Sequence, residues 1–220
     1  MIKAIKKTTC ALAVLAATSG AVMADSVDVR VIGSIQPSAC KPSLAGGGTL
    51  DYGIITPQSL KTSDYTILDK KQVQLAITCS APTKVALVSR TGRPGTALDA
   101  MLQSPQDIAY APGDLGSAFG LGLANGKAIG GYNLFLNDVT ADGTAVLTIR
   151  QHDDKTWGSV DGNLVHGSMQ SWTTGGNQPV SFTTLSGTIS AQAYINKASE
   201  LDLSKPIQLD GLATLELVYL

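Results

Sequence analysis

The sequence has few of the residues that most often carry catalysis or nucleic-acid binding. Its 220 residues include two histidines, and Asp, Glu, Lys and Arg together make up 15%. Sixteen Lys and Arg balance 17 Asp and Glu, for a formal net charge of −1. Because nucleic-acid-binding surfaces are usually basic, this balance speaks against a nucleic-acid partner.

Long apolar runs are also scarce, and the longest one lies near the N-terminus. Lys3, Lys6 and Lys7 precede an apolar stretch at Ala11–Ala17, and Val22-Met23-Ala24 offers small residues at the positions that a signal peptidase inspects. We therefore predict a signal peptide over residues 1–24, cleaved after Ala24. No stretch approaches the roughly 20 apolar residues of a membrane-spanning helix, so none is expected in the mature chain.

Three cysteines limit the disulfide possibilities. Cys10 lies inside the expected signal peptide, which leaves Cys40 and Cys79 as an even pair in an exported, oxidising setting. A disulfide between them is the prediction, and two buried free thiols are the alternative. Cleavage also removes three lysines, so the mature chain carries 13 basic and 17 acidic residues.

Short alternating segments separated by Gly, Pro, Asn and Asp recur along the chain, and no long segment has helical periodicity. This pattern predicts an all-β sandwich. The expected strands are residues 27–35, 73–79, 85–89, 132–137, 145–150, 180–184, 188–195 and 213–220. Residues 90–131 and 153–179 have looser patterns, and we expect both to be long surface excursions between strands.

The N-terminal part of the mature chain has apolar residues with a period of two. One face of residues 27–35 would carry four apolar side chains and one gap, from Val27, Val29, Val31, Gly33 and Ile35. Asp28, Arg30 and Ser34 alternate with them, with Ile32 as an exception. At the other end of the chain, Ala213, Leu215, Leu217 and Tyr219 alternate with Thr214, Glu216 and Val218.

These features together resemble the fimbrial pilins of the bacterial chaperone–usher pathway. Those proteins have an alternating N-terminal extension with one Gly, two cysteines a few dozen residues apart, and a penultimate aromatic residue. By this resemblance Val27, Val29, Val31, Gly33 and Ile35 match the donor strand, Cys40 and Cys79 the disulfide, and Tyr219 the aromatic. Asp51-Tyr52-Gly53 also resembles a short turn that follows the first Cys in many pilins. This chain is longer than an ordinary pilin, mostly in its two loose stretches.

The resemblance implies an incomplete immunoglobulin-like sandwich at residues 37–220, preceded by a donor-strand extension at residues 25–36. A neighbouring subunit's donor strand would complete the sandwich beside residues 213–220, the acceptor and chaperone-binding edge. The implied partners are a periplasmic chaperone, an outer-membrane usher and neighbouring pilin subunits, and the implied location is a surface fimbrium. The alternative is that residues 27–35 form an ordinary first strand within their own domain.

A second function class is a carbohydrate-binding adhesin or accessory subunit, in which Trp157 and Trp172 of the second excursion would stack on a sugar; packing beneath the loops is the competing interpretation. A hydrolase would have to use His152 or His166. Both histidines lie in polar stretches with no further metal ligand at a recognisable spacing. We therefore expect no catalytic activity, metal or cofactor.

Overall fold

Strands dominate the fold, as the alternating sequence predicts. The structure is a computed structural model that describes residues 27–34, 39–98 and 118–220. It separates residues 1–36 from a compact domain of residues 37–220. The described residues contain no α-helix, only the short 3₁₀ turns η1 (Ala45–Gly48), η2 (Pro57–Ser59) and η3 (Ala198–Glu200). No helix in these three ranges could cross a membrane.

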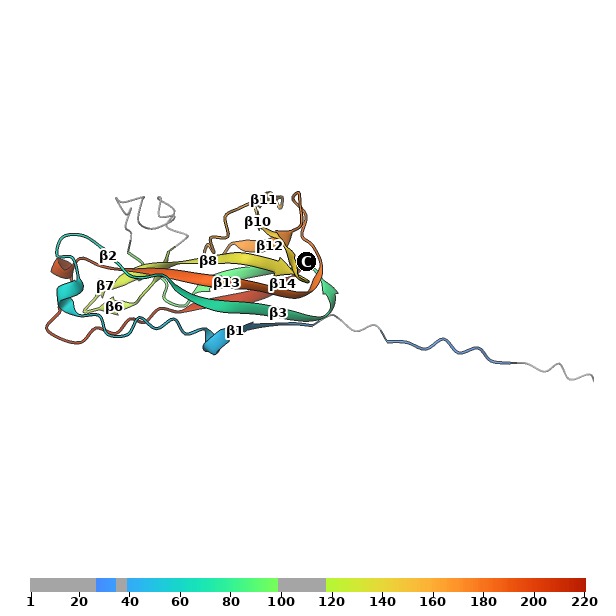
Figure 1. The fold of residues 1–220 in the computed structure, drawn as a ribbon, viewed down its shortest axis with the longest axis horizontal. Helices are drawn as coiled ribbons and strands as arrows, with labels where there is room; N and C mark the ends of the chain where they lie inside the picture. Colours follow the sequence, from blue (N-terminus) through green and yellow to red (C-terminus); the bar gives the residue numbers. More distant parts are fainter. Residues whose placement is uncertain (1–26, 35–38, 99–117) are drawn as a thin grey trace, which may run out of the picture. The chain divides into compact units, whose positions relative to one another are not determined.

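The domain consists of two facing antiparallel sheets (Figure 1). The larger sheet has the order β1-β3-β13-β8-β5, with two short strands, β2 and β9, beside β13 and β8. Its strands are β1 (Cys40–Leu44), β2 (Thr66–Ile67), β3 (Lys71–Thr83), β5 (Phe119–Gly120), β8 (Gly130–Ala141), β9 (Thr144–Ala145) and β13 (Phe182–Ile195).

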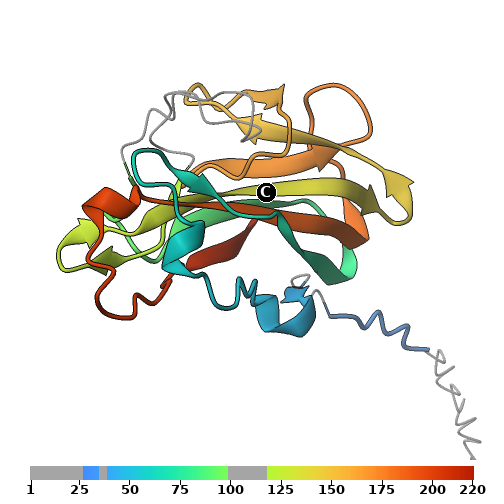
Figure 2. The same cartoon turned by 60° about the vertical axis from the view of Figure 1, so that its left-hand side comes forward.

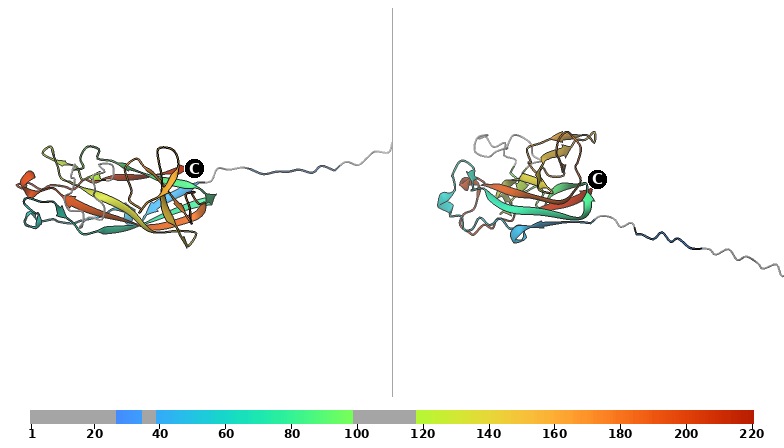
Figure 3. Two further views of the ribbon diagram at one scale, coloured as in Figure 1. Left: turned by 90° about the horizontal axis from the view of Figure 1, so that it is seen from above. Right: turned by 45° about the vertical axis from the view of Figure 1, so that its right-hand side comes forward.

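The smaller sheet has the order β11-β10-β12-β4-β14. It contains β4 (Val85–Thr91), β10 (Leu147–Gln151), β11 (Trp157–Ser159), β12 (Met169–Thr173) and β14 (Ala213–Tyr219), while β6 (Leu123–Ala124) and β7 (Lys127–Ala128) form a separate hairpin. Figure 3 shows the two layers from two further directions. The all-β sandwich class is confirmed, and the arrangement is consistent with an immunoglobulin-like sandwich.

Alternating side chains fill the space between the sheets. In β3, Val73, Leu75, Ile77 and Cys79 are buried while the residues between them are exposed, as the period of two predicts. Trp172 of β12 packs edge to face on Phe182 of β13, with ring centroids 5.8 Å apart. The core is therefore shared by both sheets.

Several strand predictions were wrong within the domain of residues 37–220. The strands predicted at residues 180–184 and 188–195 are one strand, β13, which begins at Phe182, because its register with β8 shifts between Ser186 and Thr188 instead of turning at Gly187. The excursion at residues 153–179 contains β11 and β12, and β12 lies at the centre of its sheet. β1, at Cys40–Leu44, was missed. Pro42 fits there because β1 is an edge strand, where a missing N–H leaves no ladder position empty.

The first excursion, residues 90–131, is also partly regular. It includes the end of β4, the β6–β7 hairpin and the first residues of β8. Residues 99–117 lie outside the described residues, as does the predicted signal peptide.

Candidate functional site: the groove beside β14

β14 has one open edge. Among the described strands it pairs only with β4, in a register that runs from Ala213 opposite Thr91 to Tyr219 opposite Val85. Gly92 N donates to Leu212 O, and Leu220 N donates to Lys84 O. Since successive residues of an antiparallel strand point their peptide groups to opposite sides, the odd-numbered residues from 213 to 219 direct theirs away from β4.

The predicted acceptor residues are these same four positions. Ala213, Leu215 and Leu217 pack against the core, whereas Thr214 and Glu216 are exposed. At Ala213, Leu215 and Leu217, therefore, the side chain points into the core while the peptide groups point to the open edge of β14. An added strand could therefore extend the sheet and cover apolar side chains at once.

A groove of about 1030 Å³ lies beside this strand, within the domain of residues 37–220. Its first rim is formed by residues 44–60, from the last residue of β1 onward, and its second rim by residues 201–215, which end in the first half of β14. Both rims are seen in Figure 2, the first in blue to cyan and the second in red. Most of the floor is aliphatic and comes from the larger sheet: Val73, Leu134, Ile189, Ala191, Ala193 and Ile195, with Leu121, Ile129 and Tyr132 at one end.

Tyr52 holds the first rim on the sheet. Its hydroxyl donates to Ala191 O at 3.1 Å and accepts from Ala193 N at 3.2 Å, so it bonds to the backbone of β13. Burial raises the pKa of this phenol, which keeps it a neutral donor. The Asp51-Tyr52-Gly53 turn that the sequence suggested is present: Gly53 N donates to Asp51 Oδ1, and Gly53 has a φ of +64°.

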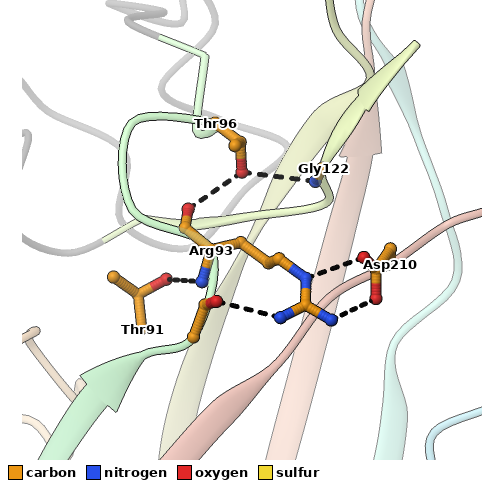
Figure 4. A network of polar contacts seen from close by, with 6 residues as sticks. Thr91, Arg93, Thr96, Gly122 and Asp210 are labelled. Carbon is orange, nitrogen blue, oxygen red and sulfur yellow. Dashed lines mark hydrogen bonds and ion pairs between the residues drawn. The ribbon is translucent and has the colours of Figure 1, made fainter.

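An ion pair holds the second rim. Arg93, just after β4, donates from Nε to Asp210 Oδ2 at 2.7 Å and from Nη2 to Asp210 Oδ1 at 2.5 Å (Figure 4). Asp210 N also donates to Leu121 O. The hydrogen bonds from Arg93 lower the pKa of the Asp210 carboxyl group. This bidentate contact fixes the chain three residues before β14 begins.

The edges of the two sheets meet at the end of β14. Cys40 N of β1 donates to the Tyr219 hydroxyl at 2.8 Å. Cys40 and Cys79 form the predicted disulfide, which joins β1 to β3. The lining of the groove includes Leu215 but neither Leu217 nor Tyr219, so the Tyr219–Cys40 contact lies beyond the end of the groove.

The predicted donor segment is exposed where the structure describes it. Val27, Val29 and Val31 are 88%, 86% and 95% exposed, and residues 27–34 contain no strand. A Cβ added to Gly33 would meet no atom within 4 Å. Ile35 lies outside the described residues. The strand predicted for residues 27–35 is thus absent from residues 27–34 of the single chain, and the apolar side chains of the described part are exposed.

Trp172, interpreted as a possible ligand contact, is 1% exposed and packs in the core. It cannot stack on a sugar, so that interpretation is wrong. Trp157 is half-buried in β11 and remains the one candidate from the pair. His166 Nδ1 accepts from Thr91 N, and the described residues contain no group of three or more His, Cys, Asp or Glu side chains that could hold a metal.

Sequence reasoning missed the Arg93–Asp210 ion pair that shapes the groove. Its members lie 117 positions apart, and neither belongs to a recognisable motif. Tyr52 was noticed only as part of a turn. Its bonds to β13 could not be foreseen from the sequence. Tyr52 and Ala193 lie 141 positions apart, and only the fold brings them together.

Comparison with known proteins gives relatives that cover most of the chain. The model of a family described as "Protein of unknown function (DUF1120)" matches residues 29–133. Protein GltF of Escherichia coli (strain K12) is 28% identical over 240 aligned residues, which cover 96% of this chain and 94% of that one. Uncharacterized protein YhcF of the same strain is 27% identical over 227 residues, covering 89% and 90%. None of these descriptions mentions fimbriae, so the resemblance to pilins remains a prediction.

Proposed function

We propose that this chain is an exported structural subunit of a surface fimbria, and that residues 27–35 of one copy complete the sandwich of the next copy. One observation carries the proposal: the open edge of β14 lies beside a largely apolar groove of about 1030 Å³. An unpaired edge above an apolar floor is a site for β-strand addition, the binding mode that includes donor-strand complementation between pilins.

The same chain offers a matching occupant. Residues 27–35 alternate apolar and polar side chains, and the three valines are at least 86% exposed. Burying Val27, Val29, Val31 and Ile35 at about 1.5–3 kcal/mol each would contribute about 6–12 kcal/mol before ordering costs. That sum is comparable to the net stability of a whole domain, so the added strand would strongly stabilise its acceptor.

The geometry of such a contact favours a filament. A strand that leaves one copy and enters the groove of another makes a heterologous interface, which continues from copy to copy when the rotation does not close. The resemblance to pilins adds two partners. A periplasmic chaperone would cover the β14 edge in transit, because exposed edges invite aggregation. At an outer-membrane usher, the next subunit would then replace the chaperone.

The proposal is tested by a valine at Gly33. In the mature chain, refolded and concentrated, we expect Gly33→Val to slow multimer formation at least tenfold. A β-branched side chain at the gap of the donor strand overpacks the groove, and about 1.4 kcal/mol of strain suffices for that factor. Multimers would be followed by size-exclusion chromatography and electron microscopy.

Gly175→Val is the matched control, since Gly175 has open space around it and lies outside the strands. It should assemble like the wild type, whereas deletion of residues 25–36 should abolish assembly. A wild-type chain that stays monomeric at every concentration, or a Gly33→Val chain that assembles normally, would contradict the proposal.

A further inference from the structure

The chain contains one Asn-Gly sequence, Asn125-Gly126, and it forms the tip of the β6–β7 hairpin. Both residues have positive φ angles, +49° for Asn125 and +78° for Gly126. A two-residue hairpin turn requires this backbone geometry, and Asn-Gly is a dipeptide that adopts it readily. Asn125 is exposed, and a Cβ added to Gly126 would meet no atom within 4 Å. Solvent therefore reaches the Asn125 side chain and the space around Gly126.

The side chain of Asn125 also holds the hairpin against the start of the second rim. Its Nδ2 donates to Asp202 Oδ2 at 3.2 Å, and Lys127 Nζ of β7 lies 3.5 Å from Glu200 Oε2. Asp202 Oδ1 accepts from both Oγ and N of Ser204. Hydrogen bonds from Ser204 and Asn125 lower the pKa of the Asp202 carboxyl group, so the rim presents a carboxylate to the Asn125 amide at neutral pH.

We propose that Asn125 is a site of spontaneous deamidation, and that the carboxylate formed there loosens the hairpin from the second rim. Hydroxide removes the proton from the backbone nitrogen of Gly126, which then attacks Asn125 Cγ. The side-chain nitrogen takes a proton from water and leaves as ammonia, which regenerates the hydroxide, and a succinimide ring forms. A water molecule then opens the ring at either carbonyl group, which leaves aspartate or isoaspartate at position 125.

The residue after Asn125 and the small size of the hairpin favour this reaction. Glycine has no side chain to obstruct the attacking nitrogen, and its backbone reaches conformations that other residues avoid. Ring closure needs the turn to leave its left-handed geometry. Because β6 and β7 have two residues each, and a two-stranded hairpin by itself is marginally stable, the tip can open at little cost. Of the other asparagines, Asn133, Asn163 and Asn196 are buried.

The product reverses the contact with Asp202 from attraction to repulsion. A carboxylate at position 125 has no proton to donate at neutral pH, and it faces the Asp202 carboxylate where the amide now donates. Because both residues are exposed, the repulsion is modest and weakens in salt. Leu201 and Leu203, on either side of Asp202, line the groove. Deamidation would thus change this rim whatever the groove binds, and the inference stands apart from the proposed function.

Incubation of the mature chain in warm, mildly alkaline buffer tests the site. Peptide mapping by mass spectrometry should show the exchange of NH₂ for OH about tenfold faster at Asn125 than at Asn177. Asn177 is the matched control, because it is also exposed but precedes Gln178. Gly126→Ala should slow the exchange at Asn125 by a similar factor. Equal rates at Asn125 and Asn177, or no exchange at Asn125, would overturn the proposal.

Asn125→Asp reproduces one product and tests its effect on the rim. We expect its melting temperature at pH 7 to be about 2 °C below that of the wild type, with the difference fading in 1 M salt. Adding Asp202→Asn should restore most of the loss, because the new amide can still accept from Ser204 while its nitrogen donates to the carboxylate at position 125. Asn177→Asp should melt like the wild type. An Asn125→Asp chain that melts like Asn177→Asp, or that Asp202→Asn does not rescue, would overturn the proposed loosening of the rim.

Discussion

The two lateral sides of the sandwich are covered in different ways. On the side of β8, the segment from Asp161 to Gly167 runs across the gap between the sheets. Leu136 N donates to Gly162 O and Leu164 N donates to Leu134 O, which pairs the segment with β8. On the side of β14, the chain provides the two rims and leaves a groove between them. The first side is closed by hydrogen bonds within the chain, whereas the second has an unpaired strand edge beside a largely apolar groove.

The segment that covers the side of β8 also forms hydrogen bonds with the smaller sheet. Gly167 N donates to Ser89 O, and Ser89 Oγ donates to Val165 O, so the same segment bonds to β4. Leu164 between these contacts is 2% exposed. The long excursion predicted from residues 153–179 therefore serves partly as structure. Its backbone hydrogen bonds satisfy an edge that would otherwise be as open as that of β14.

Leucine truncations on the two sides should have different costs. We expect Leu164→Ala to lower the free energy of unfolding of the monomer by about 3 kcal/mol, because a buried leucine leaves a cavity. Leu215→Ala, in the half-buried lining of the groove, should cost about half as much in the monomer. Denaturant unfolding of each variant measures both values.

Assembly should then change one of these costs and not the other. In multimers the cost of Leu215→Ala should rise toward that of Leu164→Ala, since an incoming strand would cover it, while the cost of Leu164→Ala should stay the same. Leu123→Ala is the control, because this exposed leucine of β6 should change stability by less than about 0.5 kcal/mol. Equal costs for Leu164 and Leu215 in the monomer would mean that the two sides do not differ.

The alternating strands were predictable because each has one buried face. In β3 and β14 the apolar residues recur every second position, and the sequence indicates both correctly. β12 was hidden for the opposite reason: both of its faces are covered, and it buries Gln170, Ser171 and Thr173. Ser171 Oγ donates to Val85 O, a bond that makes a polar residue suitable for the core and that no local pattern reveals.

Gly187 lies between the two strands that the sequence predicted, but within β13 its role is packing. A Cβ on Gly187 would lie 2.9 Å from Leu136 Cδ1 and 3.2 Å from Asn137 O, so the residue permits a close approach to β8. The groove, too, could be predicted only in part from the sequence. Its β14 edge followed from the pattern of Ala213, Leu215 and Leu217, but the rims depend on contacts between residues far apart in the sequence.

Removing the Tyr219 hydroxyl tests how much its bond to β1 stabilises the domain at the end of β14. Tyr219→Phe loses the hydrogen bond from Cys40 N, and we expect the free energy of unfolding of the monomer to fall by about 1 kcal/mol. Tyr65→Phe is the control, since the structure describes no hydrogen bond to the Tyr65 hydroxyl, and a phenylalanine ring keeps the contacts with Tyr194 and the Lys197 ammonium. An equal loss in both variants would show that the bond between β1 and β14 contributes nothing specific.

The smallest expected effect is a pH-dependent one at the second rim. Because hydrogen bonds from Arg93 lower the pKa of Asp210, its stabilising contribution is fully present above the ordinary carboxyl pKa of about 3.9. It is lost as the pH falls below that value and through the lowered pKa. Asp210→Asn should therefore melt at a lower temperature than the wild type at pH 7, and the two melting temperatures should converge in strong acid.

Replacing Arg93 tests whether the convergence of the two melting temperatures comes from the ion pair. In an Arg93→Gln background, Asp210→Asn should leave the melting temperature nearly unchanged at pH 7, because the carboxylate has already lost its partner. Three other aspartates with lowered pKa values, Asp142, Asp154 and Asp202, titrate in every variant and cancel in the comparison. A melting-temperature gap that persists without Arg93 would assign the effect to Asp210 alone, and the second rim would then depend on the backbone bond from Asp210 N to Leu121 O.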